Sequence, residues 1–230
     1  MSDSALYSGL SGATAAWRQL DVVSNNVANV STQGYKAGRI SFRTEVEGQF
    51  LQAQAAVATI SPVMSDGPLE DTGNAGHLAL RGEGWLTVQT EDGSHQLTRD
   101  GRFALDNTGL LRAPDGAILV GEQGPIQLAA GEGFRVDPQG RVFGEVSGEA
   151  GLIRMRKGPT KHAGGNRWLA NGKMERAEPT IVQGALEGSN VDAAMAMTEL
   201  IEASRYFEAF QKAIAASDEM TGRLNQSGGK

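Results

Sequence analysis

The feature that most constrains this chain is a pair of alanine-rich amphipathic segments at its opposite ends, separated by a glycine-punctuated region. The first segment covers residues 4–29, and the second covers residues 191–225. Neither segment can bury its apolar stripe against its sequence neighbours, so each needs another helix as a partner. We therefore expect two terminal helices that pack on each other and on the helices of other copies.

Apolar and small side chains in the first segment recur at alternating spacings of three and four residues. A repeat of about 3.5 residues keeps one seam facing a partner helix, as in a coiled coil. The predicted assembly seam consists of Leu6, Leu10, Ala13, Trp17, Leu20 and Val27. An ordinary surface helix folded onto its own domain is the alternative interpretation.

The second segment shows the same spacing over a longer stretch. Ser189 and Asn190 precede it and are predicted to cap the helix, with Asp192 placed favourably in its first turn. We interpret both seams as assembly surfaces, which indicates a structural subunit and not an enzyme. The seam predicted here consists of Leu200, Ala203, Phe207, Phe210 and Ile214.

An asparagine-rich stretch over residues 24–36 ends the first segment. Asn, Ser and Thr side chains compete for backbone hydrogen bonds, and Gly34 can adopt positive φ, so we expect a turn near residues 32–34. The stretch can be a capping segment, or it can be a packing corner that adjacent subunits contact.

The rest of the chain changes character at about residue 76. Residues 37–75 are polar and lack clear periodicity, which predicts an extended connector. Beyond them, alternating apolar residues and dense turn signals, such as Glu91–Ser94, predict antiparallel strands in a sandwich or small barrel.

The predicted fold class is therefore α+β, with terminal helices that form a coiled-coil domain and a central antiparallel β domain. The predicted boundaries are 1–36 for the N-terminal helix and its turn, 37–75 for the connector, 76–183 for the β domain and 184–230 for the C-terminal helix.

Composition excludes several functions. The net charge is −6, so no global basic field favours nucleic acid, and the absence of cysteine excludes disulfides and thiolate metal sites. The N-terminus lacks a basic and apolar leader, and no run of about 18 apolar residues occurs, so we expect neither a cleaved signal peptide nor membrane insertion.

No pattern of catalytic, cofactor-binding or metal-binding residues stands out. His77, His95 and His162 are scattered and have no acidic or histidine neighbour at ligand spacing. The glycines at 82 and 84 precede a predicted strand and not the helix that a dinucleotide loop requires. Two rival classes stay open: a cell-wall hydrolase whose carboxylates converge only in space, and a β module that binds cell-wall polymer.

Residues 154–176 are locally basic. A solvated face is one interpretation. A contact with an acidic subunit surface, or with anionic cell-wall polymer, is the other.

Several motifs resemble those of the bacterial flagellar rod and hook proteins. The asparagine-rich stretch resembles the family's N-terminal signature, residues 84–88 and 97–103 resemble its central pair of motifs, and residues 186–191 and 205–208 resemble its C-terminal motifs. The family-motif residues that we single out are Asn25, Asn26, Ala28, Asn29, Thr32, Gly34, Tyr35, Glu187, Ser189 and Asn190.

The resemblance implies a rod subunit of the basal body, since hook proteins usually carry more domains. It also implies type III export without a cleaved signal peptide, helical polymerisation in the periplasm and transmission of torque from motor to hook. The implied partners are copies of itself and other rod subunits, with the rod-cap muramidase and the surrounding ring proteins as further candidates; no cofactor is implied. The ending at residues 217–226 most resembles one class of rod protein, and a distal-rod subunit is the alternative to a proximal one.

Overall fold

The computed structural model describes residues 2–45 and 54–227. The chain divides into two compact units. The helical unit comprises Met1–Ala28, Gly38–Ile60 and Asp192–Lys230, and the β unit comprises Asn29–Ala37 and Ser61–Val191. The chain therefore crosses between the units after residues 28, 37, 60 and 191.

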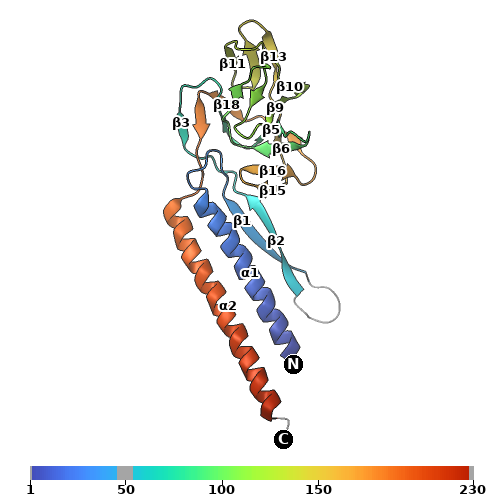
Figure 1. The fold of residues 1–230 in the computed structure, drawn as a ribbon, viewed down its shortest axis with the longest axis vertical. Helices are drawn as coiled ribbons and strands as arrows, with labels where there is room; N and C mark the ends of the chain where they lie inside the picture. The colour runs from blue at the N-terminus through green and yellow to red at the C-terminus, as the bar shows by residue number, and fades with distance from the viewer. Residues whose placement is uncertain (1, 46–53, 228–230) are drawn as a thin grey trace. The chain divides into compact units, whose positions relative to one another are not determined.

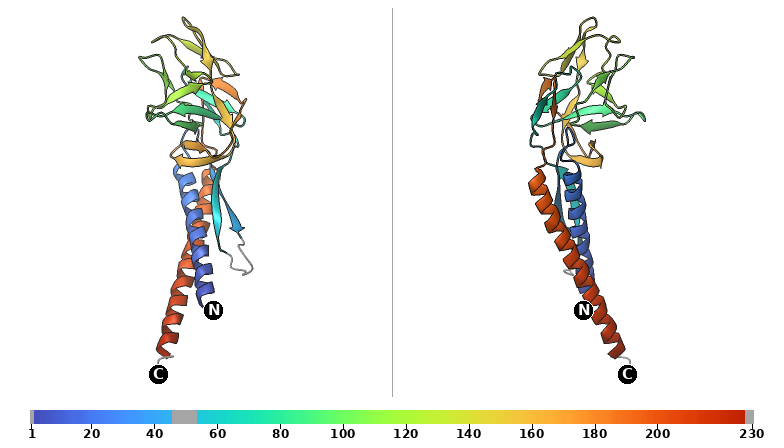
Figure 2. Two further views of the ribbon diagram at one scale, coloured as in Figure 1. Left: turned by 90° about the vertical axis from the view of Figure 1, so that its right-hand side faces the viewer. Right: turned by 60° about the vertical axis from the view of Figure 1, so that its left-hand side comes forward.

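The helical unit contains α1 (Ser2–Ala28) and α2 (Ala193–Ser227), which pack side by side (Figures 1 and 2). The helices predicted over residues 4–29 and 191–225 are thus confirmed, with ends shifted by one or two residues. Together with the antiparallel strands of the β unit, they confirm the predicted α+β class.

The prediction of an extended connector over residues 37–75 is wrong for the part that the structure describes. This range contains β1 (Gly38–Glu45), β2 (Gln54–Pro62) and β3 (Leu69–Asp71). Strand β1 pairs with β2 and packs along α1. The side chain of Asn26 fixes this packing, because its Nδ2 donates to the Gly38 carbonyl at 3.0 Å while the Gly38 N–H donates to its Oδ1 at 2.8 Å. A helix side chain thus satisfies the first backbone groups of the strand.

The β unit is built from short antiparallel strands. Its largest sheet runs β15-β16-β6-β5-β9-β8-β7, with β10 paired to β9 and with β14 between β5 and β17; β11-β12-β13, β18-β4 and β19-β3 form further sheets. The strand bounds after β3 are β4 Leu78–Arg81, β5 Trp85–Gln89, β6 His95–Thr98, β7 Ala104–Leu105, β8 Leu111–Arg112, β9 Ile118–Gly121, β10 Gly124–Pro125, β11 Phe134–Val136, β12 Arg141–Gly144, β13 Gly148–Leu152, β14 Met155–Lys157, β15 Thr160–Gly164, β16 Arg167–Ala170, β17 Glu175–Arg176, β18 Thr180–Gln183 and β19 Ala185–Glu187.

Strand β5 shows how the core is organised. Leu86 and Val88 point into the main apolar core, whereas Trp85 packs against Trp168 with a ring-centroid distance of 5.5 Å. Alternate residues of a strand face opposite sides, so this strand is buried on both faces. The predicted turn at Glu91–Ser94 is confirmed, since β5 and β6 pair around it.

Two predicted boundaries are wrong. Residues 29–36, assigned to the helical part, belong to the β unit, and so does β19, which occupies part of the range assigned to the C-terminal helix. The helix cap is also corrected: Asp192, and not Ser189 or Asn190, caps α2, because its Oδ1 accepts the Met195 N–H at 2.9 Å.

Candidate functional site

Three charged side chains from distant parts of the β unit meet in its interior. Lys36 Nζ lies 2.6 Å from Glu187 Oε1, and Arg99 Nη1 lies 3.0 Å from Glu187 Oε2. All three side chains have 0% exposure. We call Lys36, Arg99 and Glu187 the ion cluster. Buried charges on this scale require complete pairing, because each ion has lost its hydration.

Backbone groups complete the bonding of Glu187 and Lys36. The Gly67 N–H donates to Glu187 Oε1 at 3.0 Å, and Lys36 Nζ donates to the Ser65 carbonyl at 2.7 Å. Burial lowers the pKa of the Lys36 ammonium, while its hydrogen bond to Glu187 acts in the opposite direction. The ammonium is therefore held by direct partners that replace water.

Arg99 is fixed mainly by the chain that surrounds it. Its guanidinium donates to the carbonyls of Leu80, Gly82 and Gly84, in addition to Glu187. These carbonyls flank the turn between β4 and β5, so the turn and the side chain fix each other. Without Lys36, Arg99 and Glu187 would still form an ion pair whose members have further hydrogen-bond partners.

Residues 29–37, which we call the strap, bring Lys36 to this couple. The Gly34 N–H donates to the Glu187 carbonyl at 2.6 Å. Gly34 has a φ of +67°, and a Cβ at this position would lie 2.3 Å from the carbonyl carbon of Arg99. Glycine is therefore required for two reasons, the left-handed backbone and the close approach of two chain segments.

Asn190 joins three segments where the chain leaves or enters the β unit. Its Oδ1 accepts the Ala37 N–H at 2.8 Å, and its Nδ2 donates to the carbonyl of Val63 at 2.8 Å and to that of Ser65 at 3.1 Å. One side chain thereby ties together the segments around residues 37, 63 and 190. An amide suits this task because it donates and accepts at once.

The other family-motif residues have mainly local roles. Thr32 Oγ1 donates to Asn29 Oδ1 at 3.0 Å within the predicted turn, and Asn25 Nδ2 donates to the Asp21 carbonyl at 2.8 Å. Tyr35 is buried, and Ser189 Oγ accepts the Val191 N–H at 3.2 Å. Ala28 is the last residue of α1 and is exposed.

The sequence patterns did not predict that Lys36, Arg99 and Glu187 would meet. Only the apolar and glycine neighbours of Glu187 in the Leu186–Gly188 stretch offered a signal, because a carboxylate in such a setting tends to be paired.

On α2, the predicted seam coincides with the buried side of the helix. Ala203 is 1% exposed, and Leu200, Phe207, Phe210 and Ile214 are partly buried. The ring of Phe210 lies against Gly12 of α1, where an added Cβ would be 2.5 Å from Phe210 Cε1. Whether these residues also serve as an assembly seam stays a prediction.

On α1, the buried side chains differ from the predicted series. Ala16, Val22 and Val23 are buried, whereas Trp17 is 55% exposed. Val22 lies near Gly38 at the start of β1, so α1 has a covered side that a single coiled-coil seam does not include. Ala13, Leu20 and Val27 are partly buried, and the side chains of Leu6 and Leu10 lie outside the described residues.

Apolar side chains also remain exposed along the helices. On α2, they lie on both flanks of the buried side. The exposed set is Trp17, Met195, Met197, Ile201 and Tyr206.

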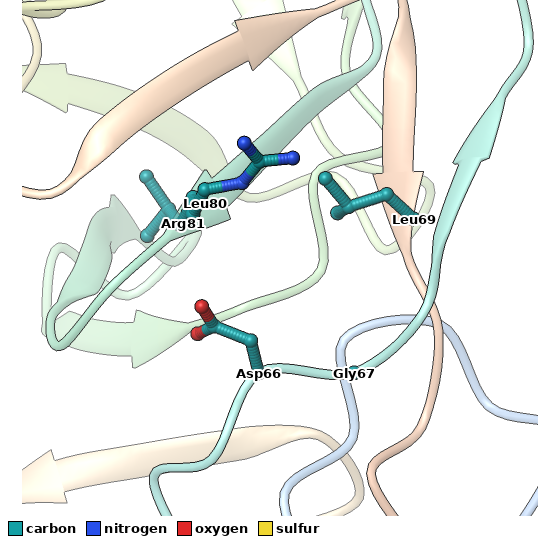
Figure 3. A pocket seen from close by; sticks show the side chains of 5 residues that line it. All are labelled: Asp66, Gly67, Leu69, Leu80 and Arg81. Atoms are coloured by element: carbon teal, nitrogen blue, oxygen red, sulfur yellow. The ribbon is translucent and has the colours of Figure 1, made fainter.

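A cavity of about 270 Å³ lies beside Asp66 and Arg81 in the β unit (Figure 3). It is lined by Asp66, Gly67, Leu69, Leu80 and Arg81. Asp66 Oδ1 is 3.9 Å from Arg99 Nη1, and its carboxylate accepts the Gly82 N–H. The carboxylate is thus engaged in holding the β4–β5 turn, and the lining holds no second carboxylate and no histidine to work with it.

Part of the basic stretch is paired with carboxylates within the chain. Arg156 pairs with Glu122 at 2.8 Å, Arg154 lies 3.9 Å from the same carboxylate, and Arg167 pairs with Asp115. These pairs weaken the interpretation of residues 154–176 as a contact surface for an acidic partner.

Among the described residues, no group of His, Asp and Glu side chains has an arrangement that could hold a metal ion. Neither α1 nor α2, over the residues described, has a stretch long and apolar enough to cross a membrane.

Comparison with known proteins gives matches along the chain in the order of its motifs. The family model "Flagella basal body rod protein" matches residues 6–36, "Flagellar hook protein FlgE/F/G D1 domain" matches 79–144, and "Flagellar basal body rod FlgEFG protein C-terminal" matches 182–227. These ranges include most of α1 and of the strap, the centre of the β unit, and β19 with α2. The resemblance seen in the sequence motifs is confirmed.

Individual relatives match over almost their full length. The chain is 31% identical to the flagellar basal-body rod protein FlgF of Escherichia coli, over 97% of this chain and 98% of the relative. It is 32% identical to FlgF of Salmonella typhimurium over the same shares, and 31% identical to FlgG of Bacillus subtilis over 95% and 97%.

Proposed function

The chain belongs to the family of flagellar basal-body rod proteins, and from that premise we propose that it builds the rod through its terminal helices. It is a structural subunit of the rod, and its relatives are named as rod proteins and not as enzymes. The proposal adds that α1 and α2 form a coiled-coil layer, that each copy contacts other copies and other rod subunits through it, and that the helical polymer transmits torque from motor to hook.

The observation that carries this proposal is the apolar surface left on paired helices. Trp17, Ile201 and Tyr206 are 55%, 55% and 62% exposed, although α1 and α2 already cover part of each other. Large exposed apolar side chains are usual at interaction surfaces. Contacts that repeat without closing a ring generate a helical polymer.

We propose a proximal position in the rod, with a distal position as the alternative. FlgF of Escherichia coli and FlgG of Bacillus subtilis are each 31% identical to the chain, so the position must be tested by localisation. The proposed location is the periplasmic part of the basal body, reached without a cleaved signal peptide. The rod-cap muramidase and the ring proteins are proposed as further contacts.

The helical contacts are tested by expressing variants in a strain that lacks the gene and measuring whether swimming is restored. We expect Ile201→Glu to abolish swimming and incorporation into isolated basal bodies, while the far-UV circular dichroism of the purified chain stays as in wild type. Gln211→Glu, on an exposed polar position of α2, is the matched control and should swim. Normal incorporation of Ile201→Glu would exclude this part of α2 as an assembly surface.

A further inference from the structure

Two members of the ion cluster, Arg99 and Glu187, are held by the β unit without the strap, whereas Lys36 belongs to the strap. Glu187 lies in β19, whose residues pair with β3 in register, and Arg99 is held by carbonyls of the β4–β5 turn. Both are therefore in place through contacts that do not involve the strap. Their opposite charges balance each other at 3.0 Å.

The strap has a different character. Among the described residues it takes part in no sheet, and its backbone forms turns of its own, such as Tyr35 N–H to the Thr32 carbonyl at 3.2 Å. It is attached by individual contacts, which include Gly34 on Glu187, Ala37 on Asn190, and the Gln33 carbonyl accepting from Asn166 Nδ2 at 2.5 Å. The Ala37 carbonyl also accepts the Val63 N–H at 2.8 Å, next to the β1–β2 pair, so the strap meets a strand ladder only at its last residue.

Lys36 differs from the other two charges of the cluster. When the strap is released, Lys36 regains water, whereas Arg99 and Glu187 keep each other. Pairing with Glu187 and Ser65 offsets the desolvation of the ammonium only when the strap is fully seated. The strap therefore docks stably only in the geometry in which Lys36 reaches both partners. In any other geometry the desolvation of the ammonium favours the undocked strap.

We propose that the strap is a latch that docks on a site preformed by Ser65, Arg99 and Glu187, and that it opens and closes while the β unit stays folded. The strap directly follows α1 in the chain. This inference concerns the single chain and does not depend on rod assembly.

Hydrogen exchange measured by mass spectrometry on the full-length wild-type chain tests the latch. The informative amides are Gly34 and Ala37, which donate within the latch, and Leu86 and Val88, which lie in β5. In increasing urea below the unfolding transition, we expect the strap amides to exchange through an opening that leaves β5 protected. Exchange of both sets only through one common unfolding event would overturn the proposal.

Substitutions at Glu187 and Lys36 test whether the charges of these residues control the opening of the strap. Glu187→Gln leaves the Lys36 ammonium and the Arg99 guanidinium buried without their shared counter-ion, but Arg99 keeps its three carbonyl acceptors. We therefore expect strap exchange to rise by roughly 100-fold, and by at least about tenfold more than exchange in β5. Lys36→Met removes the charge that must be desolvated, and we expect strap exchange within a few-fold of wild type, or slower. Adding Lys36→Met to Glu187→Gln should slow strap exchange by at least about tenfold relative to Glu187→Gln alone.

Exchange in β5 is the control, because it shows whether the ion cluster stabilises the strap alone or the whole β unit. If Glu187→Gln accelerates the strap and β5 equally, or accelerates neither, the cluster is not a latch. If that variant does not fold, the urea series on the wild type still decides the question. A dilute monomer suffices, so a failed rod-incorporation experiment would leave this result unaffected.

Discussion

Gly34 packs directly on the peptide bond that joins Arg99 to Asp100, with its missing Cβ position 2.3 Å from the Arg99 carbonyl carbon and 2.5 Å from the Asp100 nitrogen. Gly34→Ala should therefore loosen the strap by more than the backbone strain of a positive φ, which is about 1–3 kcal/mol. The measurement is the exchange rate of the strap amides together with the melting temperature of the chain.

The matched control for this substitution is Gly73→Ala. Gly73 has nearly the same φ, +65°, but no atom lies within 4 Å of its Cβ position. The difference between the two variants isolates the close approach from the backbone strain. Equal effects of the two substitutions would show that Gly34 is needed only for its φ.

Glu132 provides a pH-dependent contribution to the stability of the β unit. Hydrogen bonds, the largest contribution coming from the Ser147 hydroxyl, lower its pKa to about 2 from 4.5. The backbone N–H groups of Ala129 and Val146 also donate to its carboxylate, at 2.6 and 2.7 Å. The unfolded chain therefore binds more protons between pH 4.5 and about 2, and the stabilisation present above pH 4.5 is lost as the pH falls through this window.

Glu132→Gln should remove this dependence. At pH 6 the wild type should resist urea better than the variant, and the two unfolding curves should converge as the pH approaches 2. Tryptophan fluorescence reports the transition, since Trp85 and Trp168 are buried. In a Ser147→Ala background, the difference in urea resistance at pH 6 between the chains with Glu132 and with Glu132→Gln should become smaller but should not disappear. A difference that is the same at pH 6 and pH 2.5 would contradict this role of Glu132.

Tyr35 makes the opposite contribution at alkaline pH. Burial raises the pKa of its phenol above the usual value of 10.0. Above pH 10 the unfolded chain loses this proton while the folded chain keeps it, so stability falls as the pH rises through that range. Tyr35→Phe should show a shallower loss of melting temperature between pH 9 and pH 11 than wild type. Parallel slopes for the two proteins would contradict the prediction, whatever their absolute difference.

Much of the secondary structure could be predicted because local patterns determine it. The helices follow from apolar periodicity, and the hairpin at Glu91–Ser94 follows from its turn residues. The β1–β2 pair was missed although Ile40 and Phe42 alternate with polar residues, since the strand signal is short. Its position depends on Asn26, a helix residue whose role at Gly38 is visible only in three dimensions.

The ion cluster could not be predicted for a different reason. Lys36 and Glu187 are 151 residues apart, and each occurs in a short motif whose pattern carries no information about the other. The sequence indicated that Gly34 would allow a turn, but not that Arg99 would pack beneath it. On α1, small residues lie on several faces, so periodicity alone did not show that Ala16 and Val23 would be buried and Trp17 exposed.

Ala203 offers a direct test of helix pairing within the single chain. It is 1% exposed on α2, whereas Ala209 on the same helix is exposed. Ala203→Asp places a carboxylate against α1 without a partner, and we expect a loss of at least about 2 kcal/mol for unfolding of the helical unit. Ala209→Asp has the same cost in helix propensity but stays in water, so its effect should remain within about 0.5 kcal/mol. Thermal melting followed by circular dichroism at 222 nm measures both, and equal losses for the two variants would show that burial against α1 does not determine the stability of α2.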